Sequence, residues 1–426
     1  MNIAILTNTF TPHVGGVARS VQLFSRAYRE RGHRVLVVAP VFDGAPSQEL
    51  DVVRVPAIQH FNGSDWSVPM PVPGYLTSTL SDFQPEIVHS QHPFLLGDAA
   101  LRIAATWNIP CVFTHHTQYD RYTHYVPGDS LALKRFVTHL VTGYCNLCNL
   151  VVAPSNATSE HLRASGVTVP VEVIPTGIDL QRFTRGDPVA FRARWGIPAD
   201  ARVVGHVGRL APEKNLGFLG EAVAAYLQRT LSARFLVVGS GPSERTLEEM
   251  FAARGLSGRL HCTSTLRGDD VVSAYRAMDV FAFASTSETQ GLVLAEAAAA
   301  GVPLVALEGP GVSDVVRDRQ NGRLLSAAAS NPETFAAALD WMAALPAAAR
   351  QEQAAVLQET AREFSIDRSA DRMLALYARI CADGARPGPD SAHSFAGMVR
   401  LVGEELKILA AHFESLLAAT IPGDDD

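Results

Sequence analysis

The feature that most constrains this chain is a repeated alternation of short apolar runs with helical stretches. "IAIL" at residues 3–6 and "RVLVVAP" at 34–40 are followed by further runs of the same kind. Short runs rich in Val, Ile and Leu, separated by helices, predict parallel sheets covered on both faces. The alternation restarts with "RVVGHVGRL" at 202–210. The sequence therefore predicts an α/β fold built from two doubly wound parallel sheets.

The length of 426 residues also favours two domains over one core. We predict a first domain over residues 1–175 and a second over 176–383, with a last helix at about 366–382 that can cross back to the first. Residues 384–426 are predicted to be a linker followed by an extra amphipathic helix. Ligands bind beyond the carboxyl ends of strands in such sheets, so two facing domains predict a ligand cleft between them.

The extra helix carries an apolar stripe at helical spacing. Packing on the body, pairing with a second copy and contact with a membrane are the alternatives, and packing is the expectation. Its charged positions do not suit an anchor for anionic lipid. The stripe consists of Met398, Leu401, Val402, Leu406, Leu409, Phe413, Leu416 and Leu417.

Charge and composition exclude some classes of function. The net charge of −7 argues against a nucleic-acid-binding protein, which would carry a basic stripe. The N-terminus has no charged leader, and no apolar run reaches the ~18 residues of a membrane span. We therefore expect a cytoplasmic protein. Cys145 and Cys148 form a lone CxxC, which we interpret as buried free thiols rather than a redox or zinc site.

The strongest local signal is "STSETQGLVLAEAAAAG" at residues 285–301. A strand ends, a loop carries Glu288, and a helix begins near Gly291 with Glu296 one to two turns further on. The unpaired N–H groups of a helix start suit a phosphate, and glycine allows close approach. The two carboxylates suit sugar hydroxyls and a ribose diol. Two glutamates that merely cap and solvate an ordinary helix are the alternative.

These residues resemble a known family. Glu288 and Glu296 are similar to the Glu-x7-Glu motif of the retaining glycosyltransferases of family 4. Further segments resemble that family in the expected order over residues 1 to about 380: "FTPHVGGVARSV", "VAPSNATSEHL", "VEVIPTGID" and "GRLAPEKN". The resemblance implies the GT-B fold, with two Rossmann-like domains and the donor in the cleft between them.

The resemblance also assigns roles. Arg209 and Lys214 would hold the donor diphosphate, a fork and a point charge that together replace a metal ion. Read without the family, "RLAPEKN" would be a solvated turn. The resemblance implies His116, Arg209, Lys214 and Glu288 as catalytic residues. It implies a donor site of Gly15, Gly16, Arg209, Lys214, Thr265, Leu266, Glu288, Gly291, Leu292 and Glu296.

"THHTQYDRYTHYVP" at residues 114–127 concentrates histidines and tyrosines where a buried strand ends. His115 and His116 are adjacent on a chain leaving a strand, so their side chains point apart, which argues against a metal site. In the family, a histidine followed by threonine ends a first-domain strand and faces the donor sugar. His116 fits that pattern and would hydrogen-bond the sugar rather than act as a nucleophile.

The second half of this stretch is similar to the family members that glycosylate membrane diacylglycerol. Asp120, Tyr122 and Tyr125 occupy the places expected of an acceptor site, and tyrosines suit a water–lipid boundary. A polar, aromatic-rich helix cap is the alternative. The loop before the first helix reads "GGV", which departs from the "NGV" expected of that subset.

The resemblance implies a retaining, metal-independent transfer of a hexose from a nucleotide sugar, UDP-glucose first. The implied acceptor is a diacylglycerol-type lipid at the cytoplasmic membrane face, where the protein would bind peripherally. A soluble, polysaccharide or polyprenyl-linked acceptor is the alternative, and a sugar-nucleotide epimerase or a non-catalytic scaffold would be a different class. We expect no cofactor and no nucleic-acid partner. The sequence does not specify the donor base, the sugar or the oligomeric state.

Overall fold

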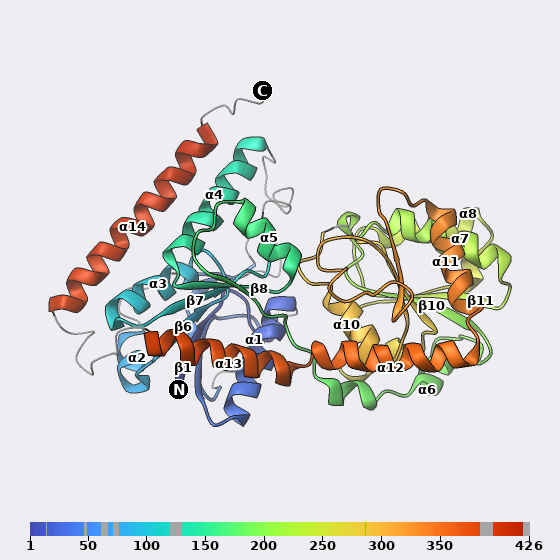
Figure 1. Ribbon diagram of the computed structural model, residues 1–426, viewed down its shortest axis with the longest axis horizontal. Helices are drawn as coiled ribbons and strands as arrows, with labels where there is room; N and C mark the ends of the chain where they lie inside the picture. The colour runs from blue at the N-terminus through green and yellow to red at the C-terminus, as the bar shows by residue number, and fades with distance from the viewer. Residues whose placement is uncertain are drawn as a thin grey trace. The chain divides into compact units, whose positions relative to one another are not determined.

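The computed structural model in Figure 1 divides the chain into two compact units. Unit 1 comprises Met1–Gly177 and Ser369–Asp426, and unit 2 comprises Ile178–Arg368. The structure describes residues 1–13, 15–46, 49–60, 67–70, 76–119, 130–285, 287–383 and 395–420. Residues 369–383, placed in the second domain by the predicted boundaries, therefore lie in unit 1, as does the described part of the C-terminal segment.

Unit 1 is built on a seven-stranded sheet with the order β3-β2-β1-β6-β7-β8-β9. Every pairing within it is parallel. Its central strands are apolar and buried on both faces, because helices cover the sheet on each side. The strands are β1 (Asn2–Leu6), β2 (Arg34–Pro40), β3 (Val52–Val55), β6 (Ile87–Ser90), β7 (Cys111–Thr114), β8 (Leu150–Ala153) and β9 (Val171–Val173). Two short strands, β4 (Ala57–Ile58) and β5 (Val68–Pro69), pair separately and antiparallel.

The helices of unit 1 follow the strands as the alternation predicts. A buried apolar cluster joins the sheet to α3 and α4, with Phe113 and Trp107 among its members. The helices are α1 (Gly16–Glu30), α2 (Thr77–Phe83), α3 (Leu96–Trp107), α4 (Leu131–Leu147), α5 (Asn156–Ala164), α13 (Ile366–Asp383) and α14 (Phe395–Thr420).

Helix α13 joins unit 1 through a buried polar contact. The hydroxyl of Tyr377 is hydrogen-bonded to Nδ1 of His89 on β6, and it lies 3.4 Å from the hydroxyl of Tyr28 on α1. Nε2 of His89 is 2.6 Å from Oγ1 of Thr114 on β7. Burial lowers the pKa of His89 to about 3, so its ring is neutral at physiological pH. Burial of these polar groups would cost free energy if any of them lacked a hydrogen-bond partner. The packing of α13 on unit 1 therefore depends on this network.

Helix α14 packs on unit 1, but by the face opposite to the one the sequence predicts. It lies along α4 and α3. Ile408 is buried, whereas Leu406 and Phe413 are 63% and 61% exposed. The expectation that the apolar stripe faces the body was therefore wrong. The physical reason is that α3 offers charged and polar partners to the other face of α14, as described below.

Unit 2 contains a six-stranded sheet with the order β12-β11-β10-β13-β14-β15, again parallel throughout. The chain runs outward from β10 to β12 on one side and from β13 to β15 on the other, so the switch point lies between β10 and β13. The strands are β10 (Arg202–Val207), β11 (Ala233–Val238), β12 (Leu260–Thr263), β13 (Val280–Phe283), β14 (Leu304–Leu307) and β15 (Gly322–Leu325).

Two apolar clusters, one on each face of this sheet, form the core of unit 2. The helices that bury them are α6 (Pro188–Arg194), α7 (Leu216–Arg229), α8 (Glu244–Ala253), α9 (Asp269–Arg276), α10 (Leu292–Ala299), α11 (Pro332–Ala343) and α12 (Ala347–Glu363). Strand β15 and helices α11 and α12 lie in a stretch for which the sequence pattern made no specific prediction.

Two further expectations concern cysteines and membrane spans. Cys145 and Cys148 are buried free thiols, as predicted, and burial raises the pKa of both. Within the described parts of the chain, the structure has no helix that is both long and apolar enough to cross a bilayer.

The buried network around α13 generates a prediction. Tyr377→Phe leaves Nδ1 of His89 without this partner in a dry environment, so we expect the free energy of unfolding to fall by about 1–3 kcal/mol. Urea unfolding followed by far-UV circular dichroism measures this change. Tyr28→Phe is the matched control, because it removes only the 3.4 Å contact and should lower the stability less. Equal effects of the two substitutions would contradict this account.

Candidate functional site

In unit 2, the residues predicted to bind the donor gather at one edge of the sheet. Arg209 and Lys214 follow β10, Thr265 follows β12, and Glu288 and Gly291 follow β13. The carboxyl ends of parallel strands meet at the same sheet edge, and ligands of open α/β sheets bind there beside the switch point. The loops after β10 and β13 flank that point.

Lys214 and Glu288 form an ion pair across the switch point. Nζ of Lys214 lies 2.6 Å from Oε1 of Glu288. Their side chains are only 16% and 17% exposed. Lys214 ends a short 3-10 helix, Pro212–Lys214, which follows the loop after β10. An ammonium group has three N–H donors, and this contact uses one of them. The pair therefore joins a cation and a carboxylate in a partly desolvated environment.

A second ion pair lies in the same loop. Nη2 of Arg209 donates to Oε1 of Glu213 over 2.6 Å. The carbonyl oxygen of Glu213 accepts from Oγ of Ser285, which lies just after β13. Glu213 thus fixes the arginine and also ties the two loops together. The sequence analysis did not single out Glu213, although its spacing of four residues from Arg209 was visible.

Helix α10 begins directly after these loops. Gly291 precedes it with φ +70°, a left-handed conformation that favours glycine. Neither a side-chain cap nor an acidic residue occupies the first turn of α10. A Cβ atom at Gly311 would lie 2.7 Å from the Cα of Gln290. The turn before α10 therefore packs directly against the backbone of Gly311. The N–H groups at the start of α10, including that of Leu292, carry the partial positive charge of a helix N-terminus.

Glu296 lies inside α10 and is only 4% exposed. Its Oε2 accepts a hydrogen bond of 2.8 Å from the hydroxyl of Tyr275 on α9. This contact orients the carboxylate that the family resemblance assigns to the ribose. Tyr275 was missed by the sequence analysis because it sits in an ordinary amphipathic helix with no motif around it.

The loops after β11 and β12 complete this edge of the sheet. Oγ1 of Thr265 lies 2.9 Å from Oγ of Ser240, and Leu266 packs on the core. Cβ atoms at Gly239 and Gly241 would lie 1.9 and 2.4 Å from the carbonyl oxygens of Gly208 and Leu210. The backbones after β10 and β11 therefore touch. The "GSG" that follows a predicted strand was the available signal for these glycines.

In unit 1, His116 follows β7 and contacts the next strand end. Its Nε2 lies 2.7 Å from Oε1 of Gln91, which follows β6. Because an amide oxygen only accepts, Nε2 carries the proton in this contact. Burial lowers the pKa of His116 to about 4, so the ring is neutral at physiological pH. A neutral ring suits the predicted role of hydrogen-bonding a sugar. Gln91 was not identified from the sequence.

His115 has a separate environment. Its ring packs edge-on against Phe113 and Tyr119, and burial lowers its pKa to about 3. It lines a small cavity of about 20 Å³ with His161 and residues of α4, a volume that suits one water molecule. The two histidines therefore have different partners, as the backbone argument against a shared metal site predicts.

The remaining predicted residues lie at the start of α1 or outside the described residues. Gly15 has an extended φ of −166° and precedes α1, whose first turn has no side-chain cap or acidic residue. A Cβ atom at Gly16 would meet nothing within 4 Å. The backbone at Gly16 is therefore open to close approach, whereas a Cβ atom at Gly15 would lie 3.3 Å from Nε2 of His13. Asp120, Tyr122 and Tyr125 lie outside the described residues.

Comparison with known proteins agrees with this geometry. The family model described as Glycosyltransferase Family 4 matches residues 14–182, and the model described as Glycosyl transferases group 1 matches residues 189–364. The crystal structure of HepE from Anabaena in complex with UDP has a TM-score of 0.69 and 21% identity, covering 89% of this chain and 100% of that chain. These findings confirm the predicted GT-B fold of two Rossmann-like domains and define the protein as a glycosyltransferase.

The named relatives carry two different activity names. The chain is 29% identical to alpha-monoglucosyldiacylglycerol synthase of Streptococcus pneumoniae over 76% of this chain and 75% of the relative. It is 29% identical to GDP-mannose-dependent alpha-mannosyltransferase of Corynebacterium glutamicum over 90% of each. The enzyme of the same name from Mycobacterium tuberculosis is 30% identical over 76% of this chain and 84% of the relative. This chain belongs to glycosyltransferase family 4.

The buried histidines predict a pH dependence of stability. His115 has a lowered pKa in the folded state, so the unfolded chain binds a proton first as the pH falls below about 6.5. The stability it contributes is therefore full above pH 6.5 and is lost as the pH falls toward 3. His115→Leu should reduce the slope of the free energy of unfolding by about 1.4 kcal/mol per pH unit in this window.

Urea unfolding of the wild type and His115→Leu at several pH values between 7.5 and 4 measures this slope. Nδ1 of His115 has no hydrogen-bond partner among the described residues, so the substitution should change the stability at pH 7.5 by less than about 1.5 kcal/mol. Parallel pH profiles for the two proteins would refute the assignment.

Proposed function

We propose that the protein is a retaining, metal-independent hexosyltransferase that moves a hexose from a nucleotide sugar to a diacylglycerol-type lipid. The observation that carries the proposal is the Lys214–Glu288 pair, held at the switch point of unit 2 directly before α10. A cation, a carboxylate and an uncapped helix start meet there within one pair of neighbouring strand ends. This combination of partners suits a diphosphate joined to a sugar.

The donor diphosphate would bind Arg209 and Lys214 beside their present carboxylate partners. The guanidinium of Arg209 offers a planar fork, and the ammonium of Lys214 keeps two N–H donors beyond its contact with Glu288. Together with the start of α10 they would stabilise the negative charge that develops on the leaving phosphate. Glu288 would accept hydrogen bonds from the sugar hydroxyls, and Nδ1 of His116, which carries no proton, would accept another.

The reaction we propose has no covalent enzyme intermediate. The acceptor hydroxyl oxygen bonds to the anomeric carbon on the face from which the phosphate leaves, and the bond from that carbon to the phosphate oxygen breaks. The hydroxyl proton passes to an oxygen of the leaving phosphate. His116 is unsuited to act as a base near neutral pH, since burial holds its pKa near 4.

UDP-glucose and diacylglycerol are the first candidates for donor and acceptor. The named activity of the Streptococcus pneumoniae relative supports the lipid, as do Asp120, Tyr122 and Tyr125 in the sequence. GDP-mannose is the second candidate donor, because the Corynebacterium glutamicum relative aligns with a larger share of this chain. The protein would work peripherally at the cytoplasmic face of the membrane. A soluble, polysaccharide or polyprenyl-linked acceptor is the runner-up.

Substitutions at the switch point test the catalytic assignment. Lys214→Ala and Glu288→Ala should each lower the rate of sugar transfer at least 100-fold, because each removes a charge from the reacting centre. The matched control is Arg245→Ala, which breaks an exposed ion pair with Glu249 elsewhere in unit 2 and should leave transfer unchanged. Far-UV circular dichroism verifies that the variants fold. Near-normal turnover of either variant would remove that residue from the mechanism.

A donor panel tests the substrates. We expect nucleotide release from one of UDP-glucose, UDP-galactose, GDP-mannose and an ADP-sugar, in EDTA, only when diacylglycerol liposomes are present. Tyr122→Ala and Tyr125→Ala should lower the lipid-dependent part of that release. Release that ignores lipid would leave a glycosyltransferase with a soluble acceptor. Loss of all release in EDTA would contradict metal independence, and turnover of the donor with no acceptor present would favour an epimerase.

A further inference from the structure

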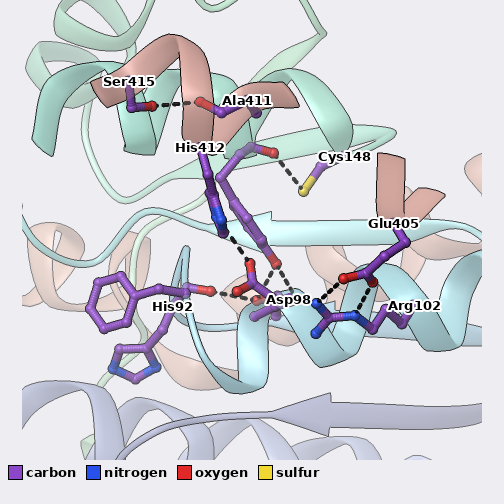
Figure 2. Close-up of polar contacts among 12 residues, drawn as sticks. His92, Asp98, Arg102, Cys148, Glu405, Ala411, His412 and Ser415 are labelled. Carbon is purple, nitrogen blue, oxygen red and sulfur yellow. Dashed lines mark hydrogen bonds and ion pairs between the residues drawn. The ribbon is translucent and has the colours of Figure 1, made fainter. Parts of the chain in front are cut away.

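Helix α14 turns its polar face inward and its apolar face outward. Figure 2 shows the inward face, where side chains of α14 meet α3. Arg102 makes a two-pronged contact with Glu405, with Nε and Nη2 at 2.6 and 3.0 Å from the two carboxylate oxygens. Nε2 of His412 lies 3.8 Å from Oδ1 of Asp98. These contacts hold the inward face of α14 against α3.

Further contacts fix the same orientation. The guanidinium of Arg400 donates to the carbonyl oxygens of Ala105 and Thr106 at the end of α3. Ile408 is 1% exposed and belongs to the core of unit 1. A Cβ atom at Gly143 of α4 would lie 3.2 Å from the Cβ of Ala411, so small residues bring the two helices close. Rotating α14 to bury its apolar face would break all of these contacts.

The outward face is a continuous apolar stripe, which we call the α14 seam. Its residues are 44–63% exposed. They comprise Met398, Val399, Val402, Leu406, Leu409, Phe413, Leu416 and Leu417. From Val399 to Leu416 the steps are 3, 4, 3, 4 and 3 residues, the a/d spacing of three heptads. That spacing produces the narrow seam by which helices pair with helices.

The seam is large enough to bind a partner. Eight large apolar side chains, each 44–63% exposed, lie in one unbroken stripe along the helix. Soluble monomers rarely expose a large contiguous apolar patch, and such a patch marks an interaction site. A stripe of this size on one well-anchored helix needs a cover.

We propose that the α14 seam is the dimer interface of this protein, covered by the α14 seam of a second copy. Heptad spacing favours a helix as the partner that packs on the seam. In a dimer with two-fold symmetry, that helix is the α14 seam of the second copy. Charge disfavours the membrane: Arg400 and Glu405 face α3, which leaves Lys407, paired with Glu404, and Glu414 as the charged side chains nearest the seam. Helices that lie on anionic lipid carry Lys and Arg beside their apolar face.

Sedimentation of the full-length chain tests the proposal. The wild type should sediment as a dimer, and Leu406→Glu should halve the sedimenting mass, because two carboxylates would meet at the centre of the seam. Leu409→Glu should act in the same way. Leu231→Glu is the matched control, since Leu231 is 80% exposed in unit 2 and its substitution should leave the dimer intact. Helix content and nucleotide release should be unchanged in all three variants.

Three results would overturn the proposal. A monomeric wild type would do so, and so would a dimer that survives both Leu406→Glu and Leu409→Glu. The third is flotation of the wild type with phosphatidylcholine vesicles when no dimer forms in solution, provided that Leu406→Glu abolishes the flotation. That result would assign the seam to a lipid surface.

Discussion

Parallel pairing of the strands is the constraint on which the rest of this structure depends. In unit 2 the central strand β10 pairs in parallel with both β11 and β13. All the strands therefore end at one edge, and residues far apart in the sequence meet there. Lys214 and Glu288 are 74 positions apart, yet their charged atoms lie 2.6 Å from each other. The backbone geometry of the sheet makes the ion pair possible, and the pair in turn defines the candidate donor site.

Burial determines the charge states around these strand ends. In unit 1, desolvation lowers the pKa of His89, His115 and His116 well below the ordinary value, so three rings close in space are neutral at physiological pH. Neutral rings pack beside strands and donate hydrogen bonds without a counter-ion. In unit 2 the cations at the sheet edge keep carboxylate partners instead. The candidate site residues thus differ in chemistry: His116 in unit 1 offers uncharged hydrogen bonding, and Arg209, Lys214 and Glu288 in unit 2 offer paired charge.

Charge also decides how the C-terminal helix is used. The contacts of Arg102 with Glu405 and of Asp98 with His412 hold the polar face of α14 against α3. The hydrogen bonds from Arg102 lower the pKa of Glu405, which keeps this carboxylate ionised. Because the polar face is occupied in this way, the apolar face is left outside. This inversion leaves the apolar face of α14 available for association, while Ile408 joins the core of unit 1.

The sequence by itself determined the fold class, the family and the segments that hold the candidate site. Those are local properties: β-branched runs mark the strands, and Glu288, Gly291 and "GRLAPEKN" lie in short motifs. Only the tertiary structure showed that Gln91 contacts His116, that Tyr275 contacts Glu296, and that Tyr377 on α13 contacts His89. Periodicity also predicted the stripe of α14 but gave it the wrong direction. The physical reason is that periodicity reports which side chains share a face, whereas the partners offered by α3 decide which face is buried.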